Sequence, residues 1–341
     1  MTIAPVQSPS MAVGKDPAVL PVMLDLTQDQ VLLARLSLRD QAQASFLDER
    51  AVGPSTPTQW LAWAAFRDAC ATAPGGAPPS YILHVSHCGS TLISRLVEAA
   101  SGARSLREPL PLRTFAVEAV QSFDGGAFLM RQERVDRIRM FEKAWCCGAP
   151  VVIKATSICN DIVDDLSPNA PVAFVYVRPE TYLATVLGRP RVKGDLRAYG
   201  QLRLRRWNAR SGWPQRMSDL RPGELAALCW LTETTSIAFA QRDFFEIDFD
   251  RFLRSPHDQL AALCRHLGVS APMDRVARAL SGPVTKVYSK NPDRAYDAAA
   301  RAQILNHGRN AAAEEIRAGL AWLETAAKAW RTAELALARY G

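Results

Sequence analysis

Short apolar runs that alternate with helical stretches constrain the fold of this chain most. Residues 81–85, 151–153 and 172–177 are continuous apolar runs rich in β-branched residues, which is typical of strands buried on both faces of a parallel sheet. Stretches with helical periodicity lie between and after them, for instance residues 134–145 and 224–240. This alternation predicts an α/β fold, with a three-layer parallel sheet and helices on both faces.

The first 79 residues lack this alternation. Prolines punctuate residues 1–22, which predicts a poorly ordered lead-in. An aromatic stripe at helical spacing indicates a helix that faces a core: Trp60, Trp63, Phe66. A Pro/Gly-rich break at residues 73–79 ends this part of the chain. We therefore expect a lead-in and small, mainly helical appendage over residues 1–79, and the α/β domain over residues 80–341.

The charge of the chain favours an anionic ligand. The 341 residues carry a net charge of +7, which suits a nucleotide. Nucleic acid is not the expected partner, because the positive charge forms neither a tail nor an aromatic RNA-binding motif. The densest basic run spans residues 189–210. It is either a solvated helix face or a cationic rim over an anion site, and charge alone does not decide between them.

Other features of the sequence predict a cytoplasmic protein. No apolar stretch is long enough to span a membrane, and the N-terminus does not have the pattern of a signal peptide. The seven cysteines have irregular spacings, which predicts reduced thiols and neither a disulfide framework nor a zinc site.

The junction between the first strand and its helix is the most informative segment. It holds a glycine among small polar residues: Ser86, His87, Cys88, Gly89, Ser90, Thr91. A turn of this kind lets backbone N–H groups surround an anion at a helix N-terminus, where the helix dipole also favours phosphate. The hydroxyls of Ser90 and Thr91 either bond the phosphate or cap the helix.

The segment is not a Walker A loop. The pattern GxxxxGK[ST] would require Gly in place of His84 and Lys in place of Ser90. The lysine that contacts a γ-phosphate is therefore absent from its expected position, which argues against hydrolysis of ATP or GTP. A nucleotide without a γ-phosphate fits better.

Four segments resemble the bacterial sulfotransferases, P-loop-related enzymes that use 3′-phosphoadenosine 5′-phosphosulfate. Residues 81–95 (YILHVSHCGSTLISR) look like their 5′-phosphosulfate-binding loop, and residues 107–110 (REPL) resemble the Glu-Pro step that follows it. Residues 174–187 are similar to the segment that binds the 3′-phosphate, and residues 249–269 to a late helix. The resemblance implies transfer of a sulfuryl group to a hydroxyl or amine of an unknown small-molecule, carbohydrate or lipid acceptor, without a catalytic metal.

The resemblance also implies which residues bind the donor. Residues 86–91 would hold the phosphosulfate, and Arg178 and Thr185 the 3′-phosphate. Two departures stand out. The family's loop has Lys or Arg where this chain has His87, so either protonated His87 or a lysine elsewhere makes that contact. Arg178 also precedes Thr185 by one residue fewer than the family's usual spacing.

Catalytic roles follow from the same resemblance, and each has a structural alternative. Glu108 is the candidate base, or else a surface carboxylate before Pro109. Lys154 ends a strand-like run, at the edge of a parallel sheet where ligands bind, and would contact the sulfuryl group together with His87. It is otherwise an ordinary strand-end lysine. His84 lies inside a strand and is interpreted as a core histidine.

A late basic loop completes the set of predicted site residues. Residues 286–292 look like the loop that sulfotransferases fold over the nucleotide, with Tyr288 and Lys290 as binding residues, although a solvated turn explains them as well.

Two other functions stay open. A kinase or nucleotide phosphotransferase of P-loop type is one, and the absent Walker lysine argues against it. A nucleotide-binding protein that has lost catalysis is the other. His87 keeps it in consideration, because it replaces the family's Lys or Arg in residues 86–91, here called the anion loop.

Overall fold

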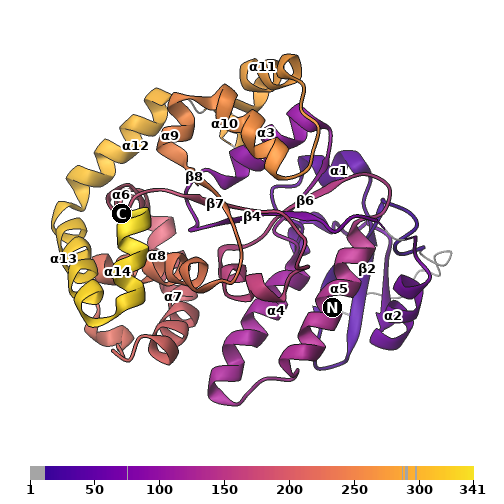
Figure 1. The fold of residues 1–341 in the computed structure, drawn as a ribbon, viewed down its shortest axis with the longest axis horizontal. Helices are drawn as coiled ribbons and strands as arrows, with labels where there is room; N and C mark the ends of the chain where they lie inside the picture. The colour runs from indigo at the N-terminus through magenta and orange to yellow at the C-terminus, as the bar shows by residue number, and fades with distance from the viewer. Residues whose placement is uncertain (1–11, 75, 286, 289–290, 296–297) are drawn as a thin grey trace.

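A parallel five-stranded sheet forms the centre of the molecule (Figure 1). The computed structural model describes residues 12–341 except 75, 286, 289–290 and 296–297. The strands have the order β5-β6-β4-β7-β8 and all neighbours are parallel. Their bounds are β4 (Ser80–His84), β5 (Arg104–Arg107), β6 (Val151–Lys154), β7 (Val172–Tyr176) and β8 (Phe245–Asp248). All residues of β4 and β6 are buried, as the apolar runs predict.

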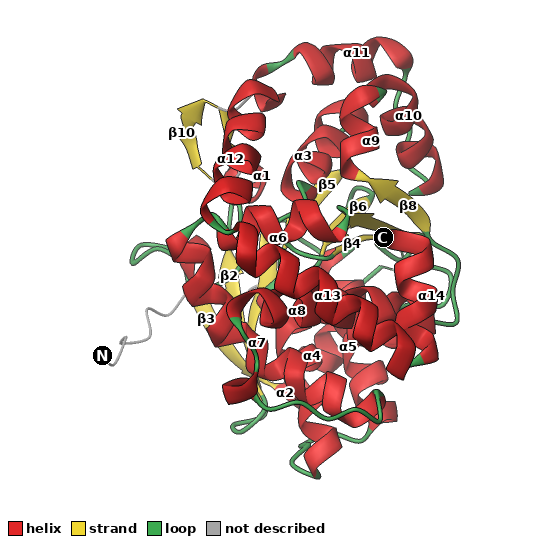
Figure 2. Cartoon of the chain, turned by 90° about the vertical axis from the view of Figure 1, so that its left-hand side faces the viewer, coloured by secondary structure: helices red, strands yellow, loops and turns green. Residues whose placement is uncertain are grey.

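Helices cover both faces of this sheet. In Figures 1 and 2, α3, α10 and α11 lie on one side, and α4, α5, α7 and α8 on the other. The first group is α3 (Ser90–Ser101), α10 (Pro256–His266) and α11 (Met273–Ser281). The second is α4 (Leu110–Gln121), α5 (Arg131–Trp145), α7 (Pro190–Arg210) and α8 (Pro222–Phe239). The predicted three-layer α/β architecture is confirmed.

Five further helices follow β7 or β8 in the chain. They are α6 (Pro179–Leu187), α9 (Phe249–Arg254), α12 (Ala298–Ala311), α13 (Ala313–Ala329) and α14 (Arg331–Tyr340). Of these, α14 packs through Tyr340 against Phe174 and Tyr176 of β7. A two-stranded ribbon, β9 (Val287–Tyr288) and β10 (Asn291–Ala295), precedes α12. In the part of the chain that the structure describes, no helix combines the length and apolarity that crossing a membrane requires.

Strand order places a ligand crevice beside β4. The chain runs from β4 to β5 on one side of the sheet and from β7 to β8 on the other, so β4 and β7 flank the point where the winding direction reverses. In open α/β sheets, ligands bind outside the carboxyl ends of the strands at such a switch point. The turn from β4 into α3 lies there.

The N-terminal part is not mainly helical, which corrects the sequence-based expectation. It contains an antiparallel sheet in the order β1-β2-β3, together with two helices. The elements are β1 (Val19–Asp25), β2 (Gln30–Arg35), α1 (Leu38–Gln43), β3 (Thr58–Ala62) and α2 (Trp63–Ala71). The prolines of this region mislead, because Pro21 lies at a register shift on the edge strand β1, where a missing N–H is tolerated.

The aromatic stripe of this region is divided between two elements. Trp60 belongs to β3 and is 45% exposed, whereas Trp63 and Phe66 lie on α2. Only the latter two share the predicted helix. The apolar residues of the N-terminal sheet join those of the central sheet in one continuous core.

Candidate functional site

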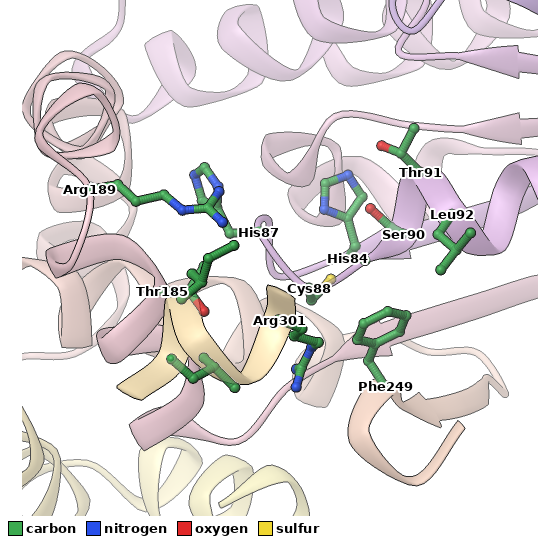
Figure 3. Close-up of a pocket in the computed structure, with 13 residues that line it drawn as sticks. His84, His87, Cys88, Ser90, Thr91, Leu92, Thr185, Arg189, Phe249 and Arg301 are labelled. Atoms are coloured by element: carbon green, nitrogen blue, oxygen red, sulfur yellow. The ribbon is translucent and has the colours of Figure 1, made fainter. Parts of the chain in front are cut away.

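A cavity opens at the turn between β4 and α3 (Figure 3). Its lining comes mainly from this turn and from three later helices, α6, α9 and α12. The lining residues are His84, His87, Cys88, Gly89, Ser90, Thr91, Leu92, Thr185, Arg189, Phe249, Arg301, Ile304 and Leu305. Five of the six residues of the predicted anion loop therefore face one space, at the switch point of the sheet.

The backbone of the turn follows an unusual course. Ser86, His87 and Gly89 have φ values of 67°, 48° and 80°, in the left-handed region that most side chains avoid. This course directs the chain into α3, whose first helical hydrogen bond runs from Ile93 N–H to Gly89 C=O at 3.1 Å. The amides before Ile93 have no acceptor within the helix, so they form the donor set that an anion requires.

Thr91 supplies a hydroxyl to the same place. Its side chain is 3% exposed and lines the cavity, and its Oγ1 has no hydrogen-bond partner among the described residues. The helix N-cap is Gly89, and no side-chain cap bond occurs there. Of the two predicted roles for the hydroxyls, helix capping is therefore not the one that Thr91 performs. A buried hydroxyl without a partner is costly, and an anion in the cavity would satisfy it.

Gly89 is required by packing as well as by its φ value. A Cβ atom at this position would lie 2.2 Å from the Phe249 ring, far inside van der Waals contact. Phe249 is the first residue of α9 and directly follows β8, and its ring packs against the anion loop at Gly89.

Two arginines bring positive charge to the cavity. Arg189 precedes α7, and in Figure 3 its side chain extends toward His87. Arg301 comes from α12; its guanidinium lies 5.4 Å from the Phe249 ring centroid and forms a 2.6 Å ion pair with Asp250. The ion pair fixes the position of the Arg301 charge beside the ring.

Glu108 and Lys154, the predicted catalytic pair, are bonded to each other. The Lys154 ammonium donates to Glu108 Oε1, and the Lys154 side chain is 1% exposed. Glu108 has a φ of 52°, and its N–H donates to the Lys154 carbonyl at 2.6 Å. Both residues lie at the carboxyl edge of the sheet: Glu108 directly follows β5, and Lys154 is the last residue of β6. Neither residue lines the cavity.

The N-terminal part of the chain holds the Glu108 turn in place. Leu47 N–H donates to the Arg107 carbonyl at 2.7 Å, and the Leu47 carbonyl accepts from Leu110 N–H at 3.1 Å. The Arg107 guanidinium is fully buried and donates to carbonyls of residues 41, 42 and 44, at the end of α1. These bonds flank Glu108 on both sides and stabilise its strained backbone.

A buried network of ion pairs connects α7 and α8 to the end of β4. Glu233 on α8 is fully buried and accepts from Arg203 at 2.7 Å and from Arg206 at 3.0 and 3.2 Å. Burial opposes the charge of Arg203, but the Glu233 carboxylate outweighs it and raises the pKa of this guanidinium. Asn160 donates to both Glu233 (3.0 Å) and the His84 carbonyl (3.1 Å), which joins the network to the end of β4.

The structure brings together only part of the predicted binding set. The predicted residues in the cavity lining are His87, Cys88, Gly89, Ser90, Thr91 and Thr185. The Ser86 hydroxyl instead lies 3.4 Å from the Tyr182 hydroxyl. The Arg178 side chain is 68% exposed and pairs with Asp248 at 3.7 Å. Lys290 lies outside the described residues, and so does the side chain of Tyr288.

The sequence-based prediction missed the Phe249 ring and three polar residues of the cavity. His84, interpreted as a core histidine, is 5% exposed but lines the cavity. Arg189 belongs to the basic run, for which a cationic rim was one of two interpretations. The other arginines of that run include Arg203 and Arg206, which form buried ion pairs instead. No sequence signal marks Arg301, because it reaches the cavity only through the placement of α12.

Comparison with known proteins finds similarity at the level of structure alone. No family model and no curated protein sequence matches this chain. Solved structures that resemble it include the sulfotransferase STF9 from Mycobacterium avium (12% identity, TM-score 0.38), which covers 73% of this chain and 80% of that chain. A sulfotransferase domain from the curacin biosynthetic pathway has 11% identity and a TM-score of 0.37, and covers 70% and 98%. Sulfotransferase STF1 from Mycobacterium tuberculosis H37Rv has 15% identity and a TM-score of 0.37, and covers 71% and 77%.

These three solved proteins carry the name of the family that the sequence motifs resemble.

Proposed function

We propose that this protein is a sulfotransferase that moves a sulfuryl group from 3′-phosphoadenosine 5′-phosphosulfate to a hydroxyl or amine. One observation carries the proposal: the loop that resembles a phosphosulfate-binding loop shares a cavity with Thr185 and Arg189. An anion at the N-terminus of α3 would satisfy the first amides of the helix and the buried Thr91 hydroxyl. A second anionic group would meet Arg189.

The donor has two anionic ends, and the cavity offers a place for each. The 5′-phosphosulfate is assigned to the loop from His87 to Thr91. The 3′-phosphate is assigned to Thr185 and Arg189, which line the cavity, and not to Arg178, which is exposed and paired with Asp248. The Phe249 ring, with Arg301 beside it, lines the cavity next to the loop and contributes apolar contact to the bound donor.

Sulfuryl transfer requires positioning, stabilisation of charge and a base. The transfer resembles phosphoryl transfer, with a loose transition state and in-line geometry. In this proposal Lys154 approaches the sulfuryl oxygens and Glu108 takes the proton of the acceptor. These two side chains are bonded to each other at the carboxyl edge of the sheet. Contacts from a charged donor such as Lys154 to the transferred group are stronger in a site that excludes water.

Substitution of Arg189 tests the placement of the nucleotide. Arg189→Ala is expected to weaken binding of adenosine 3′,5′-bisphosphate by about 10–100-fold, because a hydrogen bond to a charged group contributes about 1.5–3 kcal/mol. Binding of AMP, which lacks the 3′-phosphate, should hardly change. Titration calorimetry measures both affinities.

Arg197→Ala is the matched control, since Arg197 is an exposed arginine of α7, the helix that Arg189 precedes. An equal loss of affinity for AMP and for the bisphosphate in Arg189→Ala would remove the 3′-phosphate from this position. Absence of bisphosphate binding by the unmodified protein would overturn the proposed function itself.

A further inference from the structure

His84 occupies an unusual position for a strand residue. It is the last residue of β4, it is 5% exposed, and it lines the cavity that contains the anion loop. In Figure 3 its ring lies above the loop, on the same side as the Thr91 side chain. A histidine at this place can contact the group that the loop binds.

The loop fixes the tautomer of the neutral His84 ring. The Ser86 N–H donates to His84 Nδ1 at 2.9 Å, and the positive φ of Ser86 directs this amide back toward the ring. A nitrogen that accepts a hydrogen bond carries no proton, so the proton of the neutral ring is on Nε2. Protonation of Nδ1 would set two N–H groups against each other. The folded loop therefore selects the tautomer that is a donor at Nε2.

The backbone of His84 is fixed as well. Its carbonyl accepts from Asn160 Nδ2 at 3.1 Å, and Asn160 is held by the fully buried Glu233. Ring and backbone are thus both oriented by bonds to other groups, and a donor oriented before the reaction is the arrangement that stabilises developing charge most effectively.

We propose that His84 is a catalytic residue that donates Nε2–H to the oxygen that links sulfur to phosphorus in the donor. This inference rests on the proposed function. In the transfer, the bond between sulfur and this bridging oxygen breaks, and a new bond forms between sulfur and the acceptor oxygen or nitrogen. The bridging oxygen keeps the electron pair and leaves with the bisphosphate, the acceptor proton goes to Glu108, and His84 keeps its proton while it stabilises the new charge.

Two substitutions separate a donor from a residue that only shapes the loop. In His84→Asn, the amide oxygen can still accept from Ser86 N–H, but nothing reaches the position of Nε2. In His84→Gln, the longer side chain places an amide N–H near the position of Nε2. His257→Asn, at an exposed histidine of α10, is the matched control. Affinity for adenosine 3′,5′-bisphosphate and the rate of its release from the sulfated donor, with water or 4-nitrophenol as acceptor, are measured for each protein.

The proposal predicts that His84→Asn keeps its affinity for the bisphosphate within a few-fold and loses about 10²–10³-fold in rate, the loss typical for one such donor. His84→Gln should retain more of the rate than His84→Asn. An undiminished rate in His84→Asn, or a loss of bisphosphate affinity that accounts for the lower rate, overturns the role of His84 alone. An unmodified protein that neither binds the bisphosphate nor cleaves the donor overturns the proposed function, and the role of His84 with it.

Discussion

Replacing Glu108 by Gln is expected to lower the rate of donor turnover by about 10²–10⁴-fold, the usual contribution of a general base. Gln has the shape of Glu and can still accept from Lys154, but it takes no proton from an acceptor. Binding of adenosine 3′,5′-bisphosphate should stay within a few-fold, because Glu108 does not line the nucleotide cavity. Release of the bisphosphate from the sulfated donor and titration calorimetry give the two quantities.

A second variant shows whether the loss of rate in Glu108→Gln has a purely structural cause. Glu108→Gln leaves the buried Lys154 without a charged partner, which destabilises the turn. Glu108→Asp keeps the carboxylate and should therefore recover part of the rate. Glu49→Gln, at an exposed carboxylate of the N-terminal part, is the control. Equal rates for Glu108→Gln and the unmodified protein would exclude Glu108 as the base.

The largest loss of stability is expected from Glu233→Ala. This substitution leaves Arg203 and Arg206, which are 8% and 0% exposed, without their shared carboxylate. Removing one partner of a buried ion pair costs about 3–5 kcal/mol in the free energy of unfolding. Urea denaturation measures this loss as a lower midpoint at an unchanged slope.

An exposed ion pair provides the contrast for Glu233→Ala. Asp274 pairs with Arg278 on α11 at 2.8 Å, and both side chains are more than half exposed (66% and 71%). Asp274→Ala should therefore cost less than about 1 kcal/mol. Similar losses for the two variants would mean that the Glu233 network does not stabilise the fold as its burial indicates.

The sequence predicts the central sheet and the anion loop because both are local patterns. The runs at residues 81–85 and 172–177 become β4 and β7, nearly to the residue, since a strand buried on both faces has to be apolar throughout. Gly89 and Gly102 mark the two ends of α3 through their left-handed backbone. Small residues at the start of a helix thus predict the position of the site from local sequence alone.

Residues that reach the site through tertiary packing leave no such pattern. His84 resembles a core histidine until the Ser86 amide is seen to orient its ring at the edge of the cavity. Arg301 is one arginine in an Ala-rich helix, and only the placement of α12 brings it to Phe249. The N-terminal strands are not predicted, because prolines such as Pro21 disfavour a strand. An edge strand with a register shift accommodates this proline.

Thermal unfolding with three ligands tests the central claim most directly. Adenosine 3′,5′-bisphosphate, AMP and ATP with magnesium are compared, each at the same concentration. A ligand at about 100 times its dissociation constant adds about 2.7 kcal/mol of stability if it binds only the native state, which raises the melting temperature by several degrees. We expect the largest rise with the bisphosphate. A rise with ATP and magnesium alone would contradict a sulfotransferase and favour a kinase.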